Sequence, residues 1–317
     1  METSIFSSTE IDQASWDSLV DTSKQGQVYH LFDYINTLCA GEWQSVVVHD
    51  QNQYVAVFPF FVKKKMGLSY FIHPPFCQYW GIVMRNEKEG NQKYYDEAKK
   101  IMKLILDVLP KSFKYIHAYF SPYADYMLPL VWDGWKLTPR YTYQVDIDRG
   151  LDDILASFAS HTRREIKKAE KNGIHIQKEK GGDKAMEIFR AEKPHLVNAK
   201  NDGYLENLNK VVHKLGEERA FSICALQGEE VVAGIVYFKY KETLIYFFGT
   251  VKATHKNSGA MTAIIWESIK MHHSTCKILD FDGSMIEDIE RYFRGFDAEP
   301  VVYMKAVKSS LPQWLSL

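Results

Sequence analysis

One pattern occurs twice along this sequence and limits the folds that the chain can adopt. In each half, three short runs rich in β-branched and aromatic residues are separated by turns, over residues 43–76 and 220–253. An amphipathic helical pattern follows each set, at 94–109 and 259–273. Such runs predict antiparallel meanders, and the helical spacing of apolar residues predicts the helices. The chain is therefore expected to repeat one α/β unit.

Each helical pattern leads to one more predicted strand, at 113–120 and 277–283. The second half also has a longer opening section, which predicts a strand at 141–147, a helix from Asp152 to Gly173, a strand at 174–180 and two further helices. This order favours a mixed, mostly antiparallel sheet flanked by helices, an α/β (α+β) fold class. We expect two domains, at residues 1–138 and 139–317.

Composition narrows the class of protein. The 317 residues are 46% hydrophobic and carry a net charge of −1, so no global field favours DNA or an acidic membrane face. No apolar run approaches the length of a spanning helix. The four cysteines lie far apart in the sequence without metal or redox spacing, and the histidines form no metal-binding motif. These features predict a cytoplasmic protein with reduced, buried thiols and no metal.

Two groups of residues in the second half resemble the FemAB-like family of acyltransferases. The first group, with the spacing R-x-x-I-x-x-A-x-x-x-G-I, is Arg163, Ile166, Ala169, Gly173 and Ile174. The second, a D-F-x-G strand followed by F-K/R-x-F, is Asp280, Phe281, Gly283, Phe293, Arg294 and Phe296. The resemblance implies two tandem GNAT-like domains. It also implies transfer of an acyl group from acyl-CoA or aminoacyl-tRNA to an amine, in some members on cell-wall precursors.

The resemblance places a donor-binding loop before the helix at 259–273. In the GNAT fold, backbone N–H groups of this loop bind a pyrophosphate, aided by the helix dipole. The matching residues here are Lys256, Asn257, Ser258 and Gly259. Met261 departs from the family pattern, which has a small residue there. The alternative is a plain helix start capped by Asn257 or Ser258.

Two further segments bear on the donor and the acceptor. The segment "HTRREIKKAEKNG" (161–173) of the predicted helix carries a basic stripe, from which the resemblance selects Arg163 as a donor contact; the alternative is a solvated helix face. The segment from Asn201 to Tyr204, with Lys200 beside it, is similar to a family segment, R-D-G-F, whose arginine meets nucleotide phosphate. Asn201 stands there in place of the family's arginine, and an uncharged amide cannot form a bidentate charged contact. A UDP-linked precursor is therefore not the expected substrate.

The segment "HPPFCQYWG" (73–81) offers candidate acceptor-binding residues in the first half. Two prolines fix a turn, after which come Gln78, Tyr79 and Trp80. These side chains are expected either to line a substrate cleft between the halves or to form a packed loop.

The candidate catalytic residues lie near the C-terminus. Asp280 and Asp282 alternate along a predicted strand, so both would point to one face and one could act as base; the alternative is that they cap the following loop. Arg294 takes the place of the family's basic donor contact, and Phe293 and Phe296 are expected to anchor it in the core. Tyr292 is a candidate general acid or a packed aromatic residue.

The predicted function is an N-acyltransferase or aminoacyltransferase with a small-molecule amine acceptor. Acyl-CoA enters as a donor substrate, and no cofactor is firmly implied. Because Met261 and Asn201 depart from the family pattern, the alternative is a catalytically silent GNAT-fold protein that binds or scaffolds.

Overall fold

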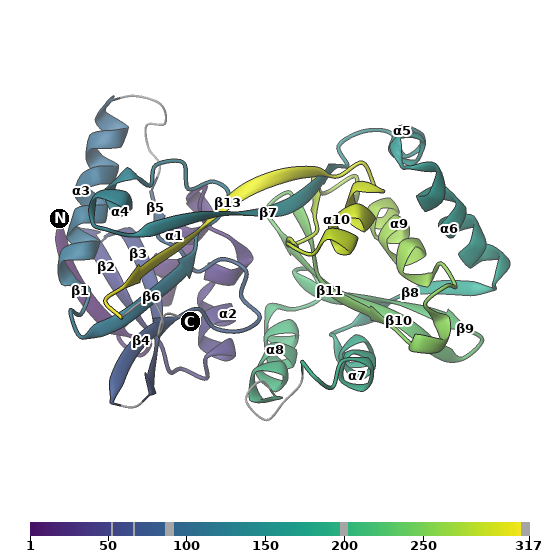
Figure 1. Cartoon of the computed structure of the whole chain (residues 1–317), viewed down its shortest axis with the longest axis horizontal. Coiled ribbons are helices and arrows are strands. Elements are labelled where there is room, and N and C mark those ends of the chain that lie inside the picture. Colours follow the sequence, from purple (N-terminus) through teal and green to yellow (C-terminus); the bar gives the residue numbers. More distant parts are fainter. Residues whose placement is uncertain (52, 66, 86–91, 197–201, 312–317) are drawn as a thin grey trace. The chain divides into compact units, whose positions relative to one another are not determined.

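The computed structural model describes residues 1–51, 53–65, 67–85, 92–196 and 202–311. The chain forms two compact units (Figure 1). Unit 1 contains the described residues of Met1–Arg140 and those from Val302 onward, and unit 2 is Tyr141–Val301. The chain therefore passes between the units twice, in the two long strands β7 (Lys136–Asp146) and β13 (Glu299–Ser309).

Unit 1 has one mixed sheet with the strand order β1-β2-β3-β4-β6-β13, and β5 pairs with β3. Its elements before β7 are β1 (Glu2–Ser7), α1 (Gln13–Thr22), η1 (Val28–His30), α2 (Phe32–Leu38), β2 (Gln44–Asp50), β3 (Gln53–Lys65), β4 (Leu68–Ile72), β5 (Val83–Met84), α3 (Gln92–Val108), β6 (Phe113–Tyr119) and α4 (Leu128–Trp132). Strands β2, β3 and β4 form the predicted antiparallel meander, and β4 pairs with β6 in parallel.

Unit 2 repeats this plan with the strand order β7-β12-β11-β10-β9-β8. Its elements are α5 (Leu151–Ser157), α6 (Ser160–Lys171), β8 (Ile174–Lys180), α7 (Asp183–Glu192), α8 (Asp202–Leu215), β9 (Ala220–Gln227), β10 (Glu230–Tyr240), β11 (Thr243–Val251), η2 (Ala253–His255), α9 (Ala260–His272), β12 (Ile278–Asp280) and α10 (Glu287–Arg294). The predicted second meander, β9-β10-β11, is confirmed. The fold class is the predicted one.

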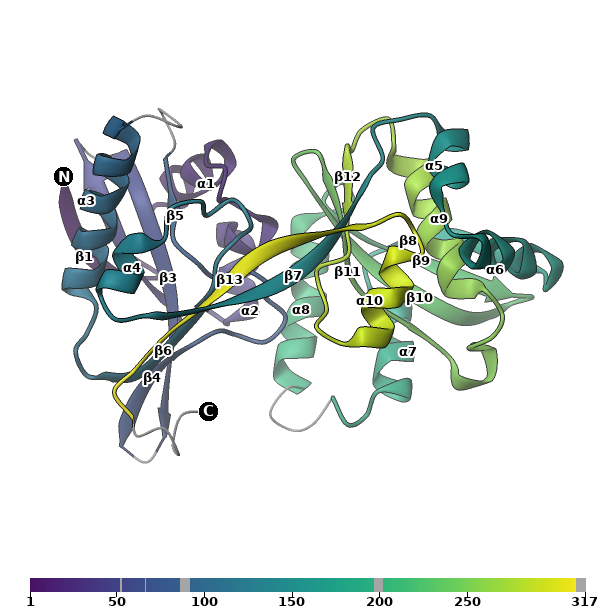
Figure 2. The same cartoon turned by 45° about the horizontal axis from the view of Figure 1, so that its top comes forward.

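Helices cover both faces of the unit 2 sheet. α6 and α9 lie side by side on one face, and α7 packs on the other (Figure 1, Figure 2). The main core lies under α6, α9 and α10, and both Phe293 and Phe296 are buried in it, as predicted. All four cysteines are buried thiols.

Two of the predicted elements have wrong bounds. The helix predicted from Asp152 to Gly173 is two helices, because Phe158 adopts an extended conformation between them and packs against Trp266 and Phe296. The strand predicted at 277–283 ends at Asp280. Beyond residue 302, β13 pairs with β6, so the last strand completes the sheet of unit 1.

No helix among the residues that the structure describes is long and apolar enough to cross a membrane.

Candidate functional site

Strands β11 and β12 form a fork in unit 2. Their parallel pairing is short and joins only Thr243–Ile245 of β11 to Ile278–Asp280 of β12. β12 then ends, and the backbone N–H of Phe281 donates to the carbonyl of Tyr143 on β7, at 2.9 Å. Asp282 and Gly283 both have positive φ angles, of 58° and 85°, and turn the chain away from β11. Within the described residues, β11 continues to Val251 without a strand partner on that side.

A β-bulge lies in β11 beside this fork. Val236 of β10 pairs with Phe248, whereas the next residue, Tyr237, pairs with Tyr246, so Phe247 is the extra residue. A bulge leaves its extra residue out of the ladder and re-aims the neighbouring backbone, and bulges are common beside active sites. The fork therefore borders backbone donors of β11 that are not used by a second strand.

Three hydroxyl groups gather at the fork, and we call Tyr246, Gly249, Thr262 and Tyr292 the fork cluster. The hydroxyls of Thr262 on α9 and Tyr292 on α10 are 3.2 Å apart. A methyl group at Gly249 would lie 2.6 Å from the Tyr246 hydroxyl and 2.8 Å from Cε of Met261, so only glycine leaves room for them. The cluster thus joins a strand and two helices at one point.

Both tyrosines of the fork cluster stay protonated. Burial raises the pKa of Tyr246, and the neighbouring Tyr292 raises it further. Burial likewise raises the pKa of Tyr292 above its usual value; the Thr262 hydrogen bond opposes this shift, and the charge of Glu165 on α6 adds to it. A neutral buried hydroxyl can donate a hydrogen bond to an oxygen that becomes negative during a reaction.

Unit 1 has an equivalent parallel pair of strands, β4 and β6. There the segment that follows β4 occupies the position that the fork has in unit 2. After β4 the chain follows β6, and the backbone N–H of Trp80 donates to the carbonyl of Tyr119 at 2.8 Å. Tyr79 and Trp80 are buried, which is the packed-loop alternative. Gln78 donates its amide N–H to the hydroxyl of Tyr303 at 3.0 Å. Of the two units, unit 2 therefore has the open fork.

The start of α9 is covered by α6. Ser258, Gly259 and Ala260 are buried, and a methyl group at Gly259 would lie 2.2 Å from the carbonyl oxygen of Glu165. The Ser258 hydroxyl accepts a hydrogen bond from the N–H of Ala260 at 3.2 Å, as in the capping alternative. Two of the predicted donor-loop residues, Lys256 and Asn257, are exposed.

The comparisons with known proteins were made by sequence and by structure. No family model matches the chain, and no curated protein matches its sequence. Among solved structures, FemX is similar over 96% of this chain and 97% of its own, with a TM-score of 0.65 and 14% identity. L-PGS from Bacillus licheniformis is similar over 96% of this chain and 94% of its own, with a TM-score of 0.58 and 11% identity. A tandem GNAT protein from the clavulanic acid biosynthesis pathway is similar over 98% of this chain and 100% of its own, with a TM-score of 0.56 and 10% identity.

This chain has a FemAB-like tandem GNAT fold. The fold resemblance expected from the sequence is confirmed. The positions of the remaining predicted residues can be described within it.

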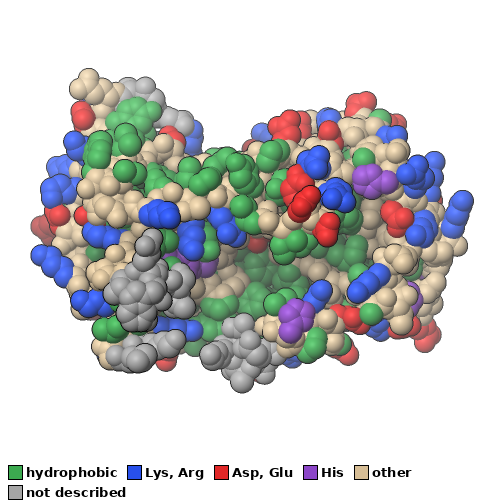
Figure 3. All heavy atoms as spheres, in the orientation of Figure 1, with side chains coloured by type: hydrophobic (Ala, Val, Ile, Leu, Met, Phe, Trp, Pro, Cys, Tyr) green, Lys and Arg blue, Asp and Glu red, His purple; other side chains and the backbone are tan. Residues whose placement is uncertain are grey.

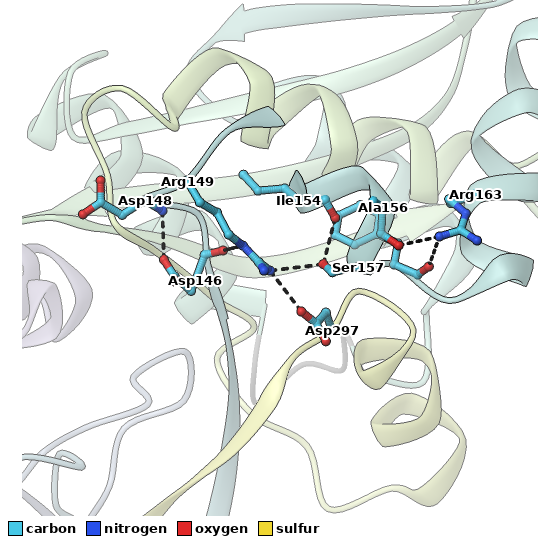
Figure 4. A network of polar contacts seen from close by, with 9 residues as sticks. Asp146, Asp148, Arg149, Ile154, Ala156, Ser157, Arg163 and Asp297 are labelled. Carbon is cyan, nitrogen blue, oxygen red and sulfur yellow. Dashed lines mark hydrogen bonds and ion pairs between the residues drawn. The ribbon is translucent and has the colours of Figure 1, made fainter. Parts of the chain in front are cut away.

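Arg163 holds the end of α5 in this GNAT fold. Its guanidinium donates to the carbonyl oxygens of Ala156 at 2.6 Å and Phe158 at 2.8 Å (Figure 4). These carbonyls belong to a helix end and the extended residue after it, where acceptors lack helical partners. Arg164, Lys167 and Lys171 are exposed on α6, where Lys and Arg side chains gather in Figure 3, and the half-buried Lys168 pairs with Glu165. This arrangement corresponds to the solvated-face alternative.

The predicted catalytic residues do not come together. Arg294 is exposed and donates its Nε–H to Glu290 at 2.5 Å. Asp280 lies at the end of β12, where Leu279 and Phe281 point into the core beside Tyr292. Since side chains alternate along an extended chain, Asp280 points to the opposite face. The prediction that Asp280 and Asp282 alternate along one strand is wrong, because the chain turns at Asp282.

Asp280 is buried and accepts three hydrogen bonds. The donors are the hydroxyl of Thr142, the amide of Gln144 at 2.7 Å and the backbone N–H of Asp282 at 2.8 Å. Burial raises the pKa of Asp280, although these hydrogen bonds oppose the shift. The carboxylate therefore ties β12 to β7 and shapes the turn that opens the fork.

This role predicts how two substitutions of Asp280 differ. Asp280→Ala leaves three buried donors without an acceptor and should lower the free energy of unfolding by about 2–3 kcal/mol. Asp280→Asn keeps an acceptor oxygen and removes a buried charge, so the free energy of unfolding should stay within about 1 kcal/mol of wild type. Urea unfolding at pH 7 measures both. Equal losses would contradict this role, and a stable Asp280→Asn without transfer activity would restore Asp280 as a catalytic base.

Two residues of the predicted acceptor segment remain. Tyr204 is half-buried on α8. Lys200 lies outside the described residues, as does Asn201.

Sequence reasoning missed three residues near the fork: Tyr246, Thr262 and Glu165. Tyr246 belongs to an aromatic run that predicts only a strand, and Thr262 belongs to an apolar helix. One signal in the sequence could have found the place, because Gly249 interrupts the run of β11 and glycine inside a strand often marks a bulge or a close approach.

Proposed function

We propose that the chain is an N-acyltransferase or aminoacyltransferase whose transfer centre is the fork of unit 2. The observation that carries the proposal is the fork cluster beside the bulge of β11, in an acyltransferase-like fold. Acyl transfer requires hydrogen-bond donors near the reacting carbonyl, and hydroxyl groups and the strand end of β12 lie together at the fork.

The reaction would be attack of an amine nitrogen on the acyl carbonyl of the donor. The C–N bond forms, and the bond to the thiol sulfur or the ribose oxygen breaks. The amine loses a proton, and the leaving sulfur or oxygen gains one. The carbonyl oxygen becomes negative in between, and hydrogen-bond donors placed for that oxygen stabilise it. Tyr292, kept neutral by burial, is such a donor.

Two donor classes fit the proposal. The tandem GNAT fold shared with the similar protein of the clavulanic acid pathway, together with the family resemblance, supports a coenzyme A thioester as one donor. FemX supports the aminoacyl branch through the family resemblance. Since α6 covers Gly259, donor phosphates would be bound from the exposed side of the loop, at Lys256 and Asn257.

Tyr292→Phe tests the transfer centre. Removing one donor to the developing oxyanion should lower kcat by about 10²-fold with little change in KM. Transfer would be followed with acetyl-CoA, longer acyl-CoAs and aminoacyl-tRNA against a panel of primary amines. Tyr240→Phe, a buried tyrosine of β10 outside the fork cluster, is the matched control and should keep full activity.

The burial of the start of α9 under α6 favours a second candidate function, a GNAT-fold binding protein without catalysis. Thermal unfolding with each donor separates the two, because a ligand that binds only the native state raises the melting temperature. Stabilisation together with transfer supports the enzyme. Stabilisation without transfer supports the binding protein, and no stabilisation by any donor contradicts the proposed function.

A further inference from the structure

A cavity of unit 2 lies at the end of α9 away from the fork. It has a volume of about 600 Å³ and is open to solvent. It is lined by Lys178, Glu217, Glu218, Arg219, Phe221, Lys239, Lys241 and His272, and we call it the basic basin. The basin includes the last residue of α9, ten residues beyond Thr262 of the fork cluster. At 1.5 Å per residue, the two sites are separated by about 15 Å along the helix.

Positive charges are concentrated in the basic basin. Four cations and two acids line it. One of the acids, Glu217, already pairs with Lys180 at 3.1 Å. In the part of the chain that the structure describes, Lys178, Arg219 and Lys239 form no ion pair with an acid. The basin therefore has an excess of positive charge that the described protein does not neutralise.

The side chains of the basin are held in place. The Lys178 ammonium lies over the ring of Phe221, 4.0 Å from its centroid, and the His272 ring stacks on Phe221 at 5.0 Å. His272 donates its Nδ1–H to the carbonyl of Ser268, so Nε2 of the neutral ring is an acceptor and would need a proton to donate to an anion. Cation–π and stacking contacts of this kind order side chains before a ligand arrives.

The charges also act on one another. Desolvation lowers the pKa of Lys178, and the charge of Lys239 lowers it further against the opposing effect of Glu217. Burial lowers the pKa of His272, with Lys178 and Lys239 adding to the shift. An anion in the basin would relieve this repulsion.

We propose that the basic basin binds a small phosphorylated ligand through Lys178, Arg219 and Lys239, beside the ring of His272. A phosphate group carries close to two charges and several strong acceptors, which suit lysine and arginine donors. The volume is that of a site for a small molecule. Glu217 and Glu218 on the rim repel an extended polyanion, which favours a small phosphate ester or pyrophosphate over RNA. The proposal does not depend on transfer at the fork.

Calorimetry with inorganic pyrophosphate tests the basin. Wild type should bind one pyrophosphate, and the double variant Lys178→Ala/Lys239→Ala should bind it at least about tenfold more weakly, since two charged hydrogen bonds are lost. Lys167→Ala/Lys171→Ala removes the same charge from the exposed face of α6 and should change the affinity less than about twofold. Equal weakening in both double variants would overturn the proposal, because it would indicate binding to net charge alone.

Wild-type protein supplies a readout that needs no variant. NMR should show the imidazole signals of His272 shifting with pyrophosphate, whereas those of the exposed His175 should not. Citrate and sulfate, added as competing anions, should displace pyrophosphate only at much higher concentration. Three results would overturn the proposal: an unchanged His272 signal, equal binding of citrate, or binding of a short RNA without binding of pyrophosphate.

Discussion

Gly259→Ala should lower the free energy of unfolding of unit 2 by about 2–5 kcal/mol. Gly259 has a φ angle of 83°, which costs a residue with a Cβ about 1–2 kcal/mol. The added methyl group would also lie 2.2 Å from the carbonyl oxygen of Glu165 and 3.0 Å from the backbone N of Ala169. Both atoms belong to the backbone of α6, so α6 and α9 would have to separate, at a cost of about 1–3 kcal/mol more.

Gly173→Ala is the matched control for this clash. Gly173 also has a positive φ angle, of 66°, but a methyl group there meets nothing within 4 Å. It should therefore cost only the backbone strain of about 1–2 kcal/mol. Urea unfolding followed by circular dichroism measures both variants. If the two losses were equal, the close approach of α6 to Gly259 would not exist in solution.

Acid should destabilise unit 1 through His73. This ring lies 4.7 Å from Tyr119 and 5.7 Å from His117 between ring centroids, and its Nε2–H donates to the carbonyl of Cys77. Burial lowers the pKa of His73 to about 3, with the neighbouring His117 adding to the shift. Between pH 6.5 and about 3, the unfolded chain therefore binds a proton that the native state does not. Stability is full above pH 6.5 and falls by about 1.4 kcal/mol per pH unit below it.

The contribution of His73 can be isolated by comparing the free energy of unfolding at pH 7.0 and at pH 4.5. About two pH units of the titration range lie between these conditions, so His73 should account for a difference of about 2.7 kcal/mol. His73→Gln should lose most of that difference, because glutamine does not titrate. His175→Gln, at an exposed histidine, should keep it. Tryptophan fluorescence suits the measurement, since five of the six tryptophans among the described residues, Trp16, Trp43, Trp80, Trp132 and Trp135, lie in unit 1. An unchanged pH difference in His73→Gln would contradict the buried, neutral state of this ring.

The elements that could be predicted from sequence are those with local signals. Each meander strand carries its own β-branched and aromatic run, and α9 carries its own apolar spacing, so periodicity was sufficient. The burial of Phe293 and Phe296 followed from the same reasoning, since large aromatic residues near a helix end are seldom left in water.

The rest depended on contacts between distant segments. Nothing near Arg163 in the sequence indicates that its guanidinium reaches back to α5, because the break at Phe158 is imposed by packing against Trp266. The fork cluster joins Tyr246, Thr262 and Tyr292 from three elements, and only the folded sheet brings them together. The turn at Asp282 was missed for a simpler reason: aspartate tolerates positive φ, and alternation with Phe281 had suggested a strand.

The path of β13 determines the order in which the protein can be completed. Its residues from Lys305 to Ser309 pair with β6, whereas the rest of unit 1 comes from the first 140 residues. On the ribosome, the amino-terminal half is translated first but must wait, with the edge of β6 unpaired, until the whole of unit 2 has been made. During that interval the unpaired edge of β6 can pair with a strand of another chain or with a non-native strand of its own. Unit 1, whose translation begins first, is therefore the last unit to be completed.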